Sequence, residues 1–414
     1  MDVTTTSTFV IVGGGLAAAK AAEALRANGF DGNIVLIGAE EHLPYERPPL
    51  SKEFLAGKKS LDDFTVHDSA WYRESSVDLR LGTAVSAIGR SAHTVTLADD
   101  STVAYDKLVL ATGSRSRRPR IPGADAAGVH YLRTFDDAGE LNSVLREGSS
   151  LAIVGAGWIG LEVASGARAR GVDVTVVETA RLPLLAALGA EAAEVFAALH
   201  REHGVNLLLE TNVAEITVQS GEATGLKLDN GSTIASDTVL VAVGAAANIE
   251  LAEQSGLDVG DGGVVVDATL RSSDPDIFAV GDIAAAEHPL FKTRIRTEHW
   301  ANALKQPVVA AANMLGRRAE YDELPYFFTD QYDLGMEYVG HAPSYERVVF
   351  RGDVGGREFI AFWVDDQDRV LAGMNVNVWD VVDDLKALIR SRAAVSAEQL
   401  ADKACPLSEL ADLS

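Results

Sequence analysis

Glycines in two short loops are the residues whose spacing points most directly to chemistry. The first loop runs from Gly13 to Ala18 in the pattern G-x-G-x-x-A, and the second runs from Gly155 to Gly160 as a full G-x-G-x-x-G. The first glycine of such a loop permits a tight turn, and the second lets the backbone approach a pyrophosphate at a helix N-terminus. Alanine is a common third residue, because that position only packs against the strand. The two matches predict two dinucleotide sites.

An acidic residue follows each loop at the distance where a nucleotide-binding fold places a ribose ligand. Glu178 comes 23 residues after Gly155 and closes the stretch VDVTVVE. A carboxylate at this position accepts both ribose hydroxyls and repels a 2′-phosphate, so the second site is predicted to select NAD. Glu40, 27 residues after Gly13, is the corresponding candidate at the first site, with a solvated surface charge as an equal alternative.

The elements that must position these loops also occur twice. Residues 8–12 (TFVIV) are predicted as a strand that enters the first loop, followed by a helix stopping at Gly29 and by a second strand, NIVLIG. The same β-α-β order starts again at Leu151. Residues 103–113 (VAYDKLVLATG) and 236–244 (SDTVLVAVG) are predicted as matching strands, so one module is used twice.

The C-terminal stretch has a different pattern. From about residue 322 it is rich in aromatic residues and alternates polar with apolar ones, as in LPYFFTDQY and REFIAFWVD. This pattern predicts a small α+β domain of antiparallel strands with a helix near 380–392. His200 and His203 are expected to be surface residues at a helix end, because no carboxylates and cysteines complete a metal site with them.

Composition and charge limit the possible functions. A chain of 414 residues fits two or three domains. The net charge of −24 argues against nucleic acid or an anionic membrane as the partner. No apolar run reaches the roughly 18 residues of a membrane span, and no secretory signal is visible. The single cysteine, Cys405, excludes an intrachain disulfide or CxxC pair and fits a cytoplasmic location.

Two dinucleotides in one chain indicate hydride transfer. One site is expected to hold a non-covalent flavin, FAD, and the other to bind an exchangeable nicotinamide, NADH. The insertion of the second module into the first is expected to bring the two rings face to face, at a gap of roughly 3–3.5 Å. The predicted domains are an FAD-binding domain (1–112 and 242–321), an NAD-binding domain (113–241) and the C-terminal domain (322–414).

Five motifs are specific in combination with the duplicated layout: YERPPLSK (45–52), LVLATGS (108–114), GAGWIGLE (155–162), DPDIFAVGD (274–282) and RTEHWANALKQ (296–306). Together they resemble a known family, the NADH-dependent, FAD-containing ferredoxin reductases of oxygenase and cytochrome P450 electron-transfer chains. The resemblance covers nearly the whole chain. It implies a glutathione-reductase-like α/β fold, with two Rossmann-like nucleotide-binding domains, the second inserted in the first, and the small α+β domain at the C-terminus.

The resemblance also implies roles for individual residues. Lys52 is expected beside the isoalloxazine ring and paired with Glu162, a surface ion pair being the alternative. Asp282 is expected to bind the ribityl chain or to cap a following helix, and Trp300 to lie on the pyrimidine side of the flavin or in the core. The predicted FAD residues are Gly13, Gly15, Ala17, Ala18, Ala39, Glu40, Arg47, Lys52, Val85, Ala111, Thr112, Gly113, Arg133, Asp282 and Trp300. The predicted NAD residues are Gly155, Gly157, Ile159, Gly160, Glu178 and Gly244.

The partner implied by the resemblance is a small acidic [2Fe–2S] ferredoxin, with a rubredoxin as the alternative, which feeds a cytochrome P450 or a ring-hydroxylating oxygenase. The chain has no cysteine cluster, so the iron–sulfur centre must belong to the partner. Arginines in 113–120, 291–296 and 316–318 are candidate docking residues; solvated loop charges and neutralisation of the FAD phosphates are equal alternatives. A monomer or weak dimer is expected.

Two other functions are alternatives to this interpretation. A disulfide-using pyridine-nucleotide enzyme needs a redox cysteine near the flavin, and residues 41–60 contain none. The second alternative is a flavoprotein switch resembling apoptosis-inducing factor, in which NADH binding changes an interaction surface instead of driving turnover.

Overall fold

The structure, a computed structural model, describes residues 6–412. These residues form two compact units, each assembled from separate stretches of the chain. The first unit takes residues 6–46, 61–115 and 245–325, and the second takes 47–60, 116–244 and 326–412. The three predicted domains remain a prediction. The segment 47–60, which carries Lys52, belongs to the same unit as Glu162.

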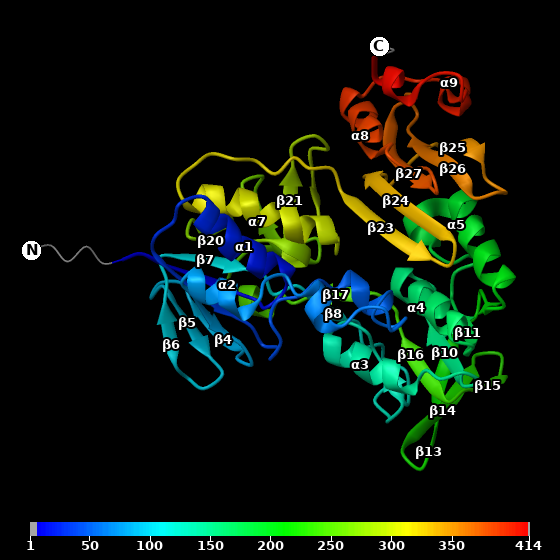
Figure 1. Ribbon diagram of the computed structural model, residues 1–414, viewed down its shortest axis with the longest axis horizontal. Coiled ribbons are helices and arrows are strands. Elements are labelled where there is room, and N and C mark those ends of the chain that lie inside the picture. Colours follow the sequence, from blue (N-terminus) through cyan, green and yellow to red (C-terminus); the bar gives the residue numbers. More distant parts are fainter. Residues whose placement is uncertain (1–5, 413–414) are drawn as a thin grey trace, which may run out of the picture. The chain divides into compact units, whose positions relative to one another are not determined.

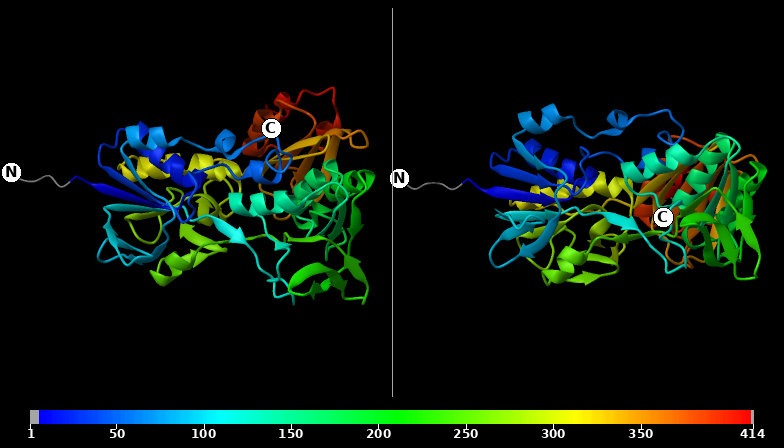
Figure 2. Two further views of the ribbon diagram at one scale, coloured as in Figure 1. Left: turned by 60° about the horizontal axis from the view of Figure 1, so that its bottom comes forward. Right: turned by 90° about the horizontal axis from the view of Figure 1, so that it is seen from below.

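A five-stranded parallel sheet in the order β20-β7-β1-β2-β3 forms the core of the first unit. Val10 of β1 lies opposite Val35 on one side and Leu108 on the other. Apolar strands of this kind are typical of parallel sheets that are covered on both faces. Helices α1 (Leu16–Ala27) and α7 (Trp300–Met314) lie side by side (Figures 1 and 2). The strands are β1 Thr8–Val12, β2 Asn33–Ile37, β3 Val77–Arg80, β7 Lys107–Leu110 and β20 Ile277–Ala279.

The second unit repeats this sheet. Its order is β12-β11-β10-β16-β9, so β10 takes the place of β1, β11 that of β2 and β16 that of β7. Each unit also carries a three-stranded antiparallel sheet, β4-β5-β6 in the first and β13-β14-β15 in the second. The predicted duplication of one module is therefore confirmed, and it extends beyond the glycine loops. The strands are β9 Val129–His130, β10 Ser150–Val154, β11 Asp173–Val177, β12 Asn206–Leu208 and β16 Thr238–Val241; the antiparallel sheets are β4 Val85–Gly89, β5 Thr94–Leu97, β6 Thr102–Ala104, β13 Val213–Gln219, β14 Glu222–Leu228 and β15 Thr233–Ala235.

The remaining elements connect these sheets. A four-stranded sheet, β18-β19-β21-β22, completes the first unit, and β8 pairs with β17. The bounds are η1 Pro48–Ser51, η2 Leu61–Phe64, α2 Ser69–Glu74, β8 Ser114–Ser116, α3 Phe135–Val144, α4 Trp158–Ala169, α5 Leu185–Glu202, β17 Ala245–Ala247, α6 Glu250–Gln254, β18 Val259–Gly260, β19 Gly263–Val266, η3 Gly281–Ile283, β21 Ala284–His288 and β22 Thr293–Ile295.

The C-terminal stretch of the second unit is an antiparallel sheet, as predicted, in the order β23-β24-β27-β26-β25 (Figure 1). Trp363 of β26 is buried, and its Nε1 donates to the carbonyl of Leu188 in α5 at 3.1 Å. The expected helix near 380–392 is present as α8. The bounds are β23 Tyr326–Gln331, β24 Leu334–Gly340, β25 Arg347–Asp353, β26 Glu358–Val364, β27 Val370–Val376, α8 Val382–Ser391, α9 Ala397–Ala401 and η4 Leu407–Asp412.

The single strand predicted over 103–113 is wrong. The chain forms β6 and β7 instead, in two different sheets, with Tyr105 and Asp106 between them. The Oδ2 atom of Asp106 accepts a hydrogen bond from the backbone N–H of Thr8 at 2.7 Å, which anchors the turn at the start of β7. None of the helices among residues 6–412 is both long enough and apolar enough to span a bilayer.

Candidate functional site

The first glycine loop has the geometry of a phosphate cradle. Gly13 has a φ of +136°, and a Cβ atom there would lie 2.1 Å from the carbonyl oxygen of Ala111. Only glycine fits this crossing between β1 and the end of β7. A Cβ on Gly15, by contrast, meets nothing within 4 Å, so the backbone at the N-terminus of α1 is open. An open helix N-terminus of this kind accepts an anion.

The second loop repeats the arrangement at the start of α4. Gly155 has a φ of +103°, and its Cβ would lie 2.5 Å from the carbonyl oxygen of Ala242. A Cβ on Gly157 meets nothing within 4 Å, whereas one on Gly160 would lie 2.3 Å from the carbonyl of Gly155. The third glycine is therefore needed for helix–strand packing, and the second leaves room for a pyrophosphate.

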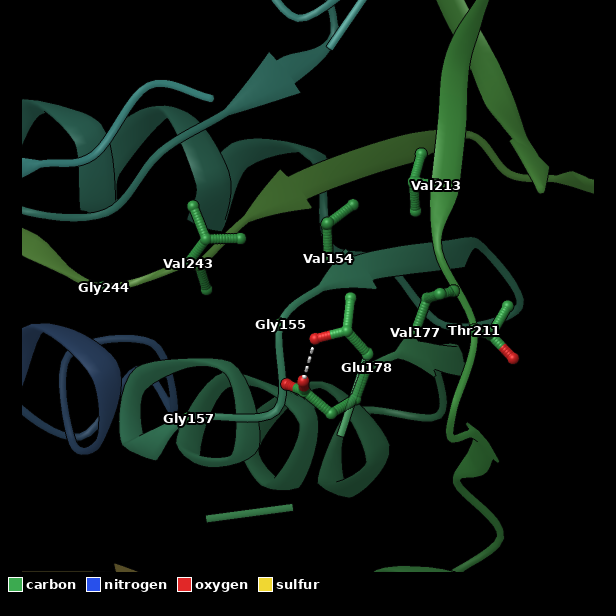
Figure 3. A pocket seen from close by; sticks show the side chains of 11 residues that line it. Val154, Gly155, Gly157, Val177, Glu178, Thr211, Val213, Val243 and Gly244 are labelled. Atoms are coloured by element: carbon green, nitrogen blue, oxygen red, sulfur yellow. Dashed lines mark hydrogen bonds between the residues drawn. The ribbon is translucent and has the colours of Figure 1, made fainter. Parts of the chain in front are cut away.

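A pocket of about 330 Å³ lies against this second loop (Figure 3). Glu178 lies at its edge, where its Oε2 accepts from the N–H of Ala156 at 2.8 Å and its Oε1 from the N–H of Ala180 at 2.9 Å. These two bonds hold the carboxylate at the end of β11, beside the glycine loop. Pockets for small ligands commonly begin near 300 Å³. The lining residues are Val154, Gly155, Gly157, Val177, Glu178, Thr179, Thr211, Val213, Ala242, Val243 and Gly244.

The predicted NAD residues occupy different positions around this pocket. Gly155, Gly157, Glu178 and Gly244 line it. Gly160 instead packs inside the loop, and the side chain of Ile159 is 38% exposed on the first turn of α4. The other seven lining residues were missed from the sequence, because no motif marks them: Val154, Val177, Thr179, Thr211, Val213, Ala242 and Val243.

Most of the predicted FAD residues lie in the first unit, near the carboxyl ends of its parallel strands. Ala17 and Ala18 are buried in α1, and Ala39 and Glu40 follow β2. Ala111, Thr112 and Gly113 follow β7, where Thr112 Oγ1 donates to the carbonyl of Asn248 at 2.9 Å. Glu40 Oε2 accepts from the hydroxyl of Tyr45 at 2.5 Å, so this carboxylate is held in place by the protein. Val85 is the first residue of β4.

Asp282 and Trp300 also belong to the first unit. Asp282 lies in the turn η3 and its Oδ2 accepts from the hydroxyl of Ser114 at 2.6 Å. The expected helix after Asp282 is wrong, because residues 284–288 form strand β21. Trp300 begins α7, is partly exposed, and donates from Nε1 to Glu46 at 3.1 Å, so it is not a core residue.

Lys52 and Glu162 form the ion pair that the sequence predicts. Lys52 Nζ donates to Glu162 Oε1 at 2.7 Å. The side chains are only 11% and 7% exposed, so the alternative of a surface pair is wrong. Two hydroxyls also donate to this carboxylate: Ser51 to Oε2 at 2.5 Å and Thr329 to Oε1 at 2.6 Å. The Lys52 ammonium lies 5.3 Å from the centroid of the Phe328 ring.

The remaining predicted FAD residues, Arg47 and Arg133, lie in the same unit as this pair. Arg47 Nη1 donates to the carbonyl oxygen of Arg133 at 2.5 Å, so the two residues are brought together. The backbone of Arg47 caps the 3₁₀ turn η1, which immediately precedes Lys52.

Known proteins share this architecture. The family described as pyridine nucleotide-disulphide oxidoreductase matches residues 7–307, and the family described as reductase C-terminal matches residues 326–411. The chain belongs to the pyridine nucleotide-disulphide oxidoreductase family. It is accordingly an oxidoreductase of the flavoprotein class that uses FAD and NAD(H), and both glycine cradles fit that requirement.

Individual relatives in this family narrow the resemblance. The ferredoxin–NAD(+) reductase component of the anthranilate 1,2-dioxygenase system of Burkholderia cepacia is 42% identical over 396 residues, covering 95% of this chain and 97% of the relative. Putidaredoxin reductase of Pseudomonas putida is 36% identical, with coverage of 97% and 96%. The crystal structure of the covalent putidaredoxin reductase–putidaredoxin complex matches with a TM-score of 0.94 at 35% identity, covering 98% of both chains.

Three arginines in the basic stretches of this oxidoreductase are paired with acids of the same unit. Arg115 lies 2.5 Å from Glu250, Arg294 donates to Asp261 at 2.8 Å, and Arg296 donates to Glu298 at 2.7 Å. Each of these pairs offsets part of the positive field that would attract an acidic partner. The role of the arginines in docking remains a proposal.

The expectation that His200 is a surface residue is wrong. Its side chain is fully buried in α5, and burial lowers its pKa to about 4. Its Nε2 lies 2.8 Å from Gln331 Oε1 of β23, so the face of α5 that carries it packs against the C-terminal sheet. His203, one turn later, stacks on Tyr332 at 3.7 Å between ring centroids. No cluster of possible metal ligands occurs within residues 6–412.

Proposed function

We propose that the chain is an NADH:ferredoxin reductase that passes electrons from NADH through FAD to a small [2Fe–2S] ferredoxin. The observation that carries this proposal is the duplicated module, which supplies two open glycine cradles and holds the carboxylate of Glu178 beside the second. The relatives named ferredoxin–NAD(+) reductase and putidaredoxin reductase support the choice of acceptor.

FAD, when bound, supplies the step that converts a two-electron donor into single-electron transfers. The residues around Gly13 and Gly15 would hold its pyrophosphate, and Glu40 and Asp282 would bind its ribose and ribityl hydroxyls. At the second cradle, Gly157 would admit the pyrophosphate of NADH, and Glu178 would accept hydrogen bonds from its ribose hydroxyls. Lys52 presents its positive charge in a fixed direction, because its ammonium donates to Glu162, and two hydroxyls hold that carboxylate in turn.

The partner completes the proposal. It is a small acidic ferredoxin that delivers electrons to a cytochrome P450 or a ring-hydroxylating oxygenase, with a rubredoxin as the alternative acceptor. The single cysteine of the chain fits a cytoplasmic location and leaves the iron–sulfur centre to the partner.

The test is NADH-driven reduction of ferredoxins from the same genome by the purified protein. We expect a yellow protein with extractable FAD, and bleaching of one ferredoxin on addition of NADH but not of NADPH at the same concentration. A colourless folded protein would exclude the proposal. A long-lived complex of NAD with reduced flavin, and negligible transfer to every ferredoxin and rubredoxin tried, would favour the flavoprotein switch instead.

Replacing Lys52 tests the role of the ion pair. Lys52→Met is expected to slow flavin reduction by NADH by about 10²-fold, because one preorganised charge near a reacting centre contributes on that scale. The measurement is stopped-flow absorbance of the flavin at saturating NADH. Because the change leaves the buried Glu162 without its cation, the double variant Lys52→Met/Glu162→Gln is measured too and should remain equally slow.

The matched control is Lys59→Ala. Lys59 lies in the same segment, pairs with Glu53 at 3.3 Å, and has a side chain that is 39% exposed. Surface pairs of this kind contribute little, so the rate should not change. Wild-type rates in both Lys52 variants would assign the ion pair a purely structural role.

A further inference from the structure

A chain of buried polar side chains leads away from the Lys52–Glu162 pair. Thr329 Oγ1 donates to Glu162 Oε1 at 2.6 Å, and Gln331 Nε2 donates to Thr329 Oγ1 at 3.2 Å. Gln331 Oε1 lies 2.8 Å from His200 Nε2, and His200 Nδ1 lies 3.4 Å from the hydroxyl of Tyr332. All of these residues belong to the second unit.

The direction of every bond in this chain follows from its chemistry. A carbonyl oxygen only accepts, so His200 Nε2 must carry the proton that Gln331 Oε1 receives. Burial keeps this imidazole neutral by lowering its pKa to about 4, so its Nδ1 has no proton and accepts from the Tyr332 hydroxyl. Each donor therefore points toward Glu162, through Gln331 and Thr329. Aligned hydrogen bonds polarise one another, and the last donates most strongly.

The alternation of side chains along β23 places these residues together. Residues two apart in a strand face the same side, and Thr329 and Gln331 of β23 face helices α4 and α5, where both are 1% exposed. The hydroxyl of Ser165, one turn after Glu162, accepts from the backbone N–H of Tyr332 at 2.9 Å. Burying polar side chains costs free energy unless they are hydrogen-bonded, and Thr329 and Gln331 are bonded to one another.

We infer that Thr329 and Gln331 are positioning residues for the proposed reaction: they align Glu162, and through it the ammonium of Lys52. The expected effect on the rate of flavin reduction rests on the proposed function, whereas the alignment of Glu162 and Lys52 does not. Without Thr329 the carboxylate would accept one hydrogen bond at each oxygen, from Lys52 at Oε1 and from Ser51 at Oε2. The Thr329 hydroxyl adds a second bond at Oε1, the oxygen that holds Lys52, and so narrows the orientations open to that oxygen.

The test compares Thr329→Val, which removes the hydroxyl at nearly constant volume, with Thr329→Ser, which keeps it. The first readout is the rate at which Lys52 in the FAD-loaded protein is acetylated by a small amine-reactive ester, followed by peptide mass spectrometry. We expect Thr329→Val to raise this rate several-fold, Gln331→Met to raise it less, and Thr329→Ser to restore the wild-type value. This readout needs no turnover, so it remains decisive even if the protein reduces no ferredoxin.

The second readout is stopped-flow reduction of the flavin by NADH. Thr329→Val should slow it by about tenfold, the scale of one hydrogen bond to a charged group, and Thr329→Ser should rescue it. Thr217→Val is the matched control. The Thr217 hydroxyl lies on β13 and is hydrogen-bonded to the hydroxyl of Thr224. Its labelling and flavin reduction should match the wild type.

Each outcome decides one part of the inference. Unchanged labelling of Lys52 in Thr329→Val would overturn the positioning role, whatever the rate. Faster labelling with an unchanged rate would overturn its link to the reaction. A change in Thr329→Val but none in Gln331→Met would end the positioning chain at Thr329. If Thr329→Val does not fold, Gln331→Met alone decides, and wild-type labelling in it overturns the inference.

Discussion

Replacing Gly13 with alanine is expected to give a protein that retains no FAD. The φ of +136° is one that alanine rarely adopts, and its Cβ would lie 2.1 Å from the backbone oxygen of Ala111. Relieving this overlap would separate β1 from the end of β7, at the point where the cofactor loop begins. The expected cost is more than about 3 kcal/mol of unfolding free energy. The measurements are the flavin absorbance of the purified protein and a denaturant titration.

Gly15→Ala is the matched control for this prediction. It lies two residues away in the same loop, but its Cβ meets no atom of the protein within 4 Å. This variant should fold with nearly unchanged stability, and it should bind FAD more weakly, because the methyl group occupies the approach of the pyrophosphate. If Gly13→Ala binds FAD like the wild type, the first loop is not the cradle of the flavin. An equal loss of stability in both variants would show that any side chain in this loop is destabilising, and that the overlap at Gly13 is not the specific cause.

The sequence predicts the duplicated module well because the signal is local. A glycine loop between a short apolar strand and a helix occupies about twenty residues, and the backbone geometry at Gly13 and Gly155 admits little else. The pairing of Lys52 with Glu162 lies beyond such local signals. It followed only from the resemblance to a family, and the structure shows the contact without testing its catalytic role.

Other parts of the site were not predictable from local patterns. Thr329 is 167 residues from Glu162 in the chain, and its strand was recognised only by its alternation. The sequence signal that could have revealed it is the polar pair Thr329 and Gln331 at alternate, inward-facing positions of an aromatic strand. His200 was misplaced for a related reason: a histidine near a helix end is usually solvated, and only the packing of α5 against β23 buries it.

The break at Tyr105 and Asp106 was missed because only these two residues separate β6 from β7, too short a gap for strand propensity to mark. The hydrogen bonds of Asp106 with Thr8 decide where the run leaves one sheet and enters the next. Sheet membership is a property of tertiary pairing, whereas strand propensity mainly reflects how a side chain fits a pleated surface.

Selectivity for NADH is expected to depend on Glu178 more than on any other residue of the second cradle. Glu178→Ala should raise KM for NADH by about 10- to 100-fold, since each lost hydrogen bond to a charged acceptor contributes on the order of 1.5–3 kcal/mol. It should also narrow the preference for NADH over NADPH, because the repulsion of the 2′-phosphate disappears. Steady-state rates with both nucleotides measure the two effects, with Glu194→Ala, an exposed change on α5, as the control.

Glu178→Gln separates the charge from the position of this side chain. The carboxylate is held by the N–H groups of Ala156 and Ala180, and an amide oxygen can keep one of these bonds while the charge is lost. If repulsion dominates selectivity, Glu178→Gln should accept NADPH nearly as well as Glu178→Ala does, with a smaller rise in KM for NADH. If the hydrogen bonds dominate, Glu178→Gln should stay close to the wild type. An unchanged NADH-to-NADPH ratio in both variants would remove Glu178 from the nucleotide site and place selectivity elsewhere in the pocket.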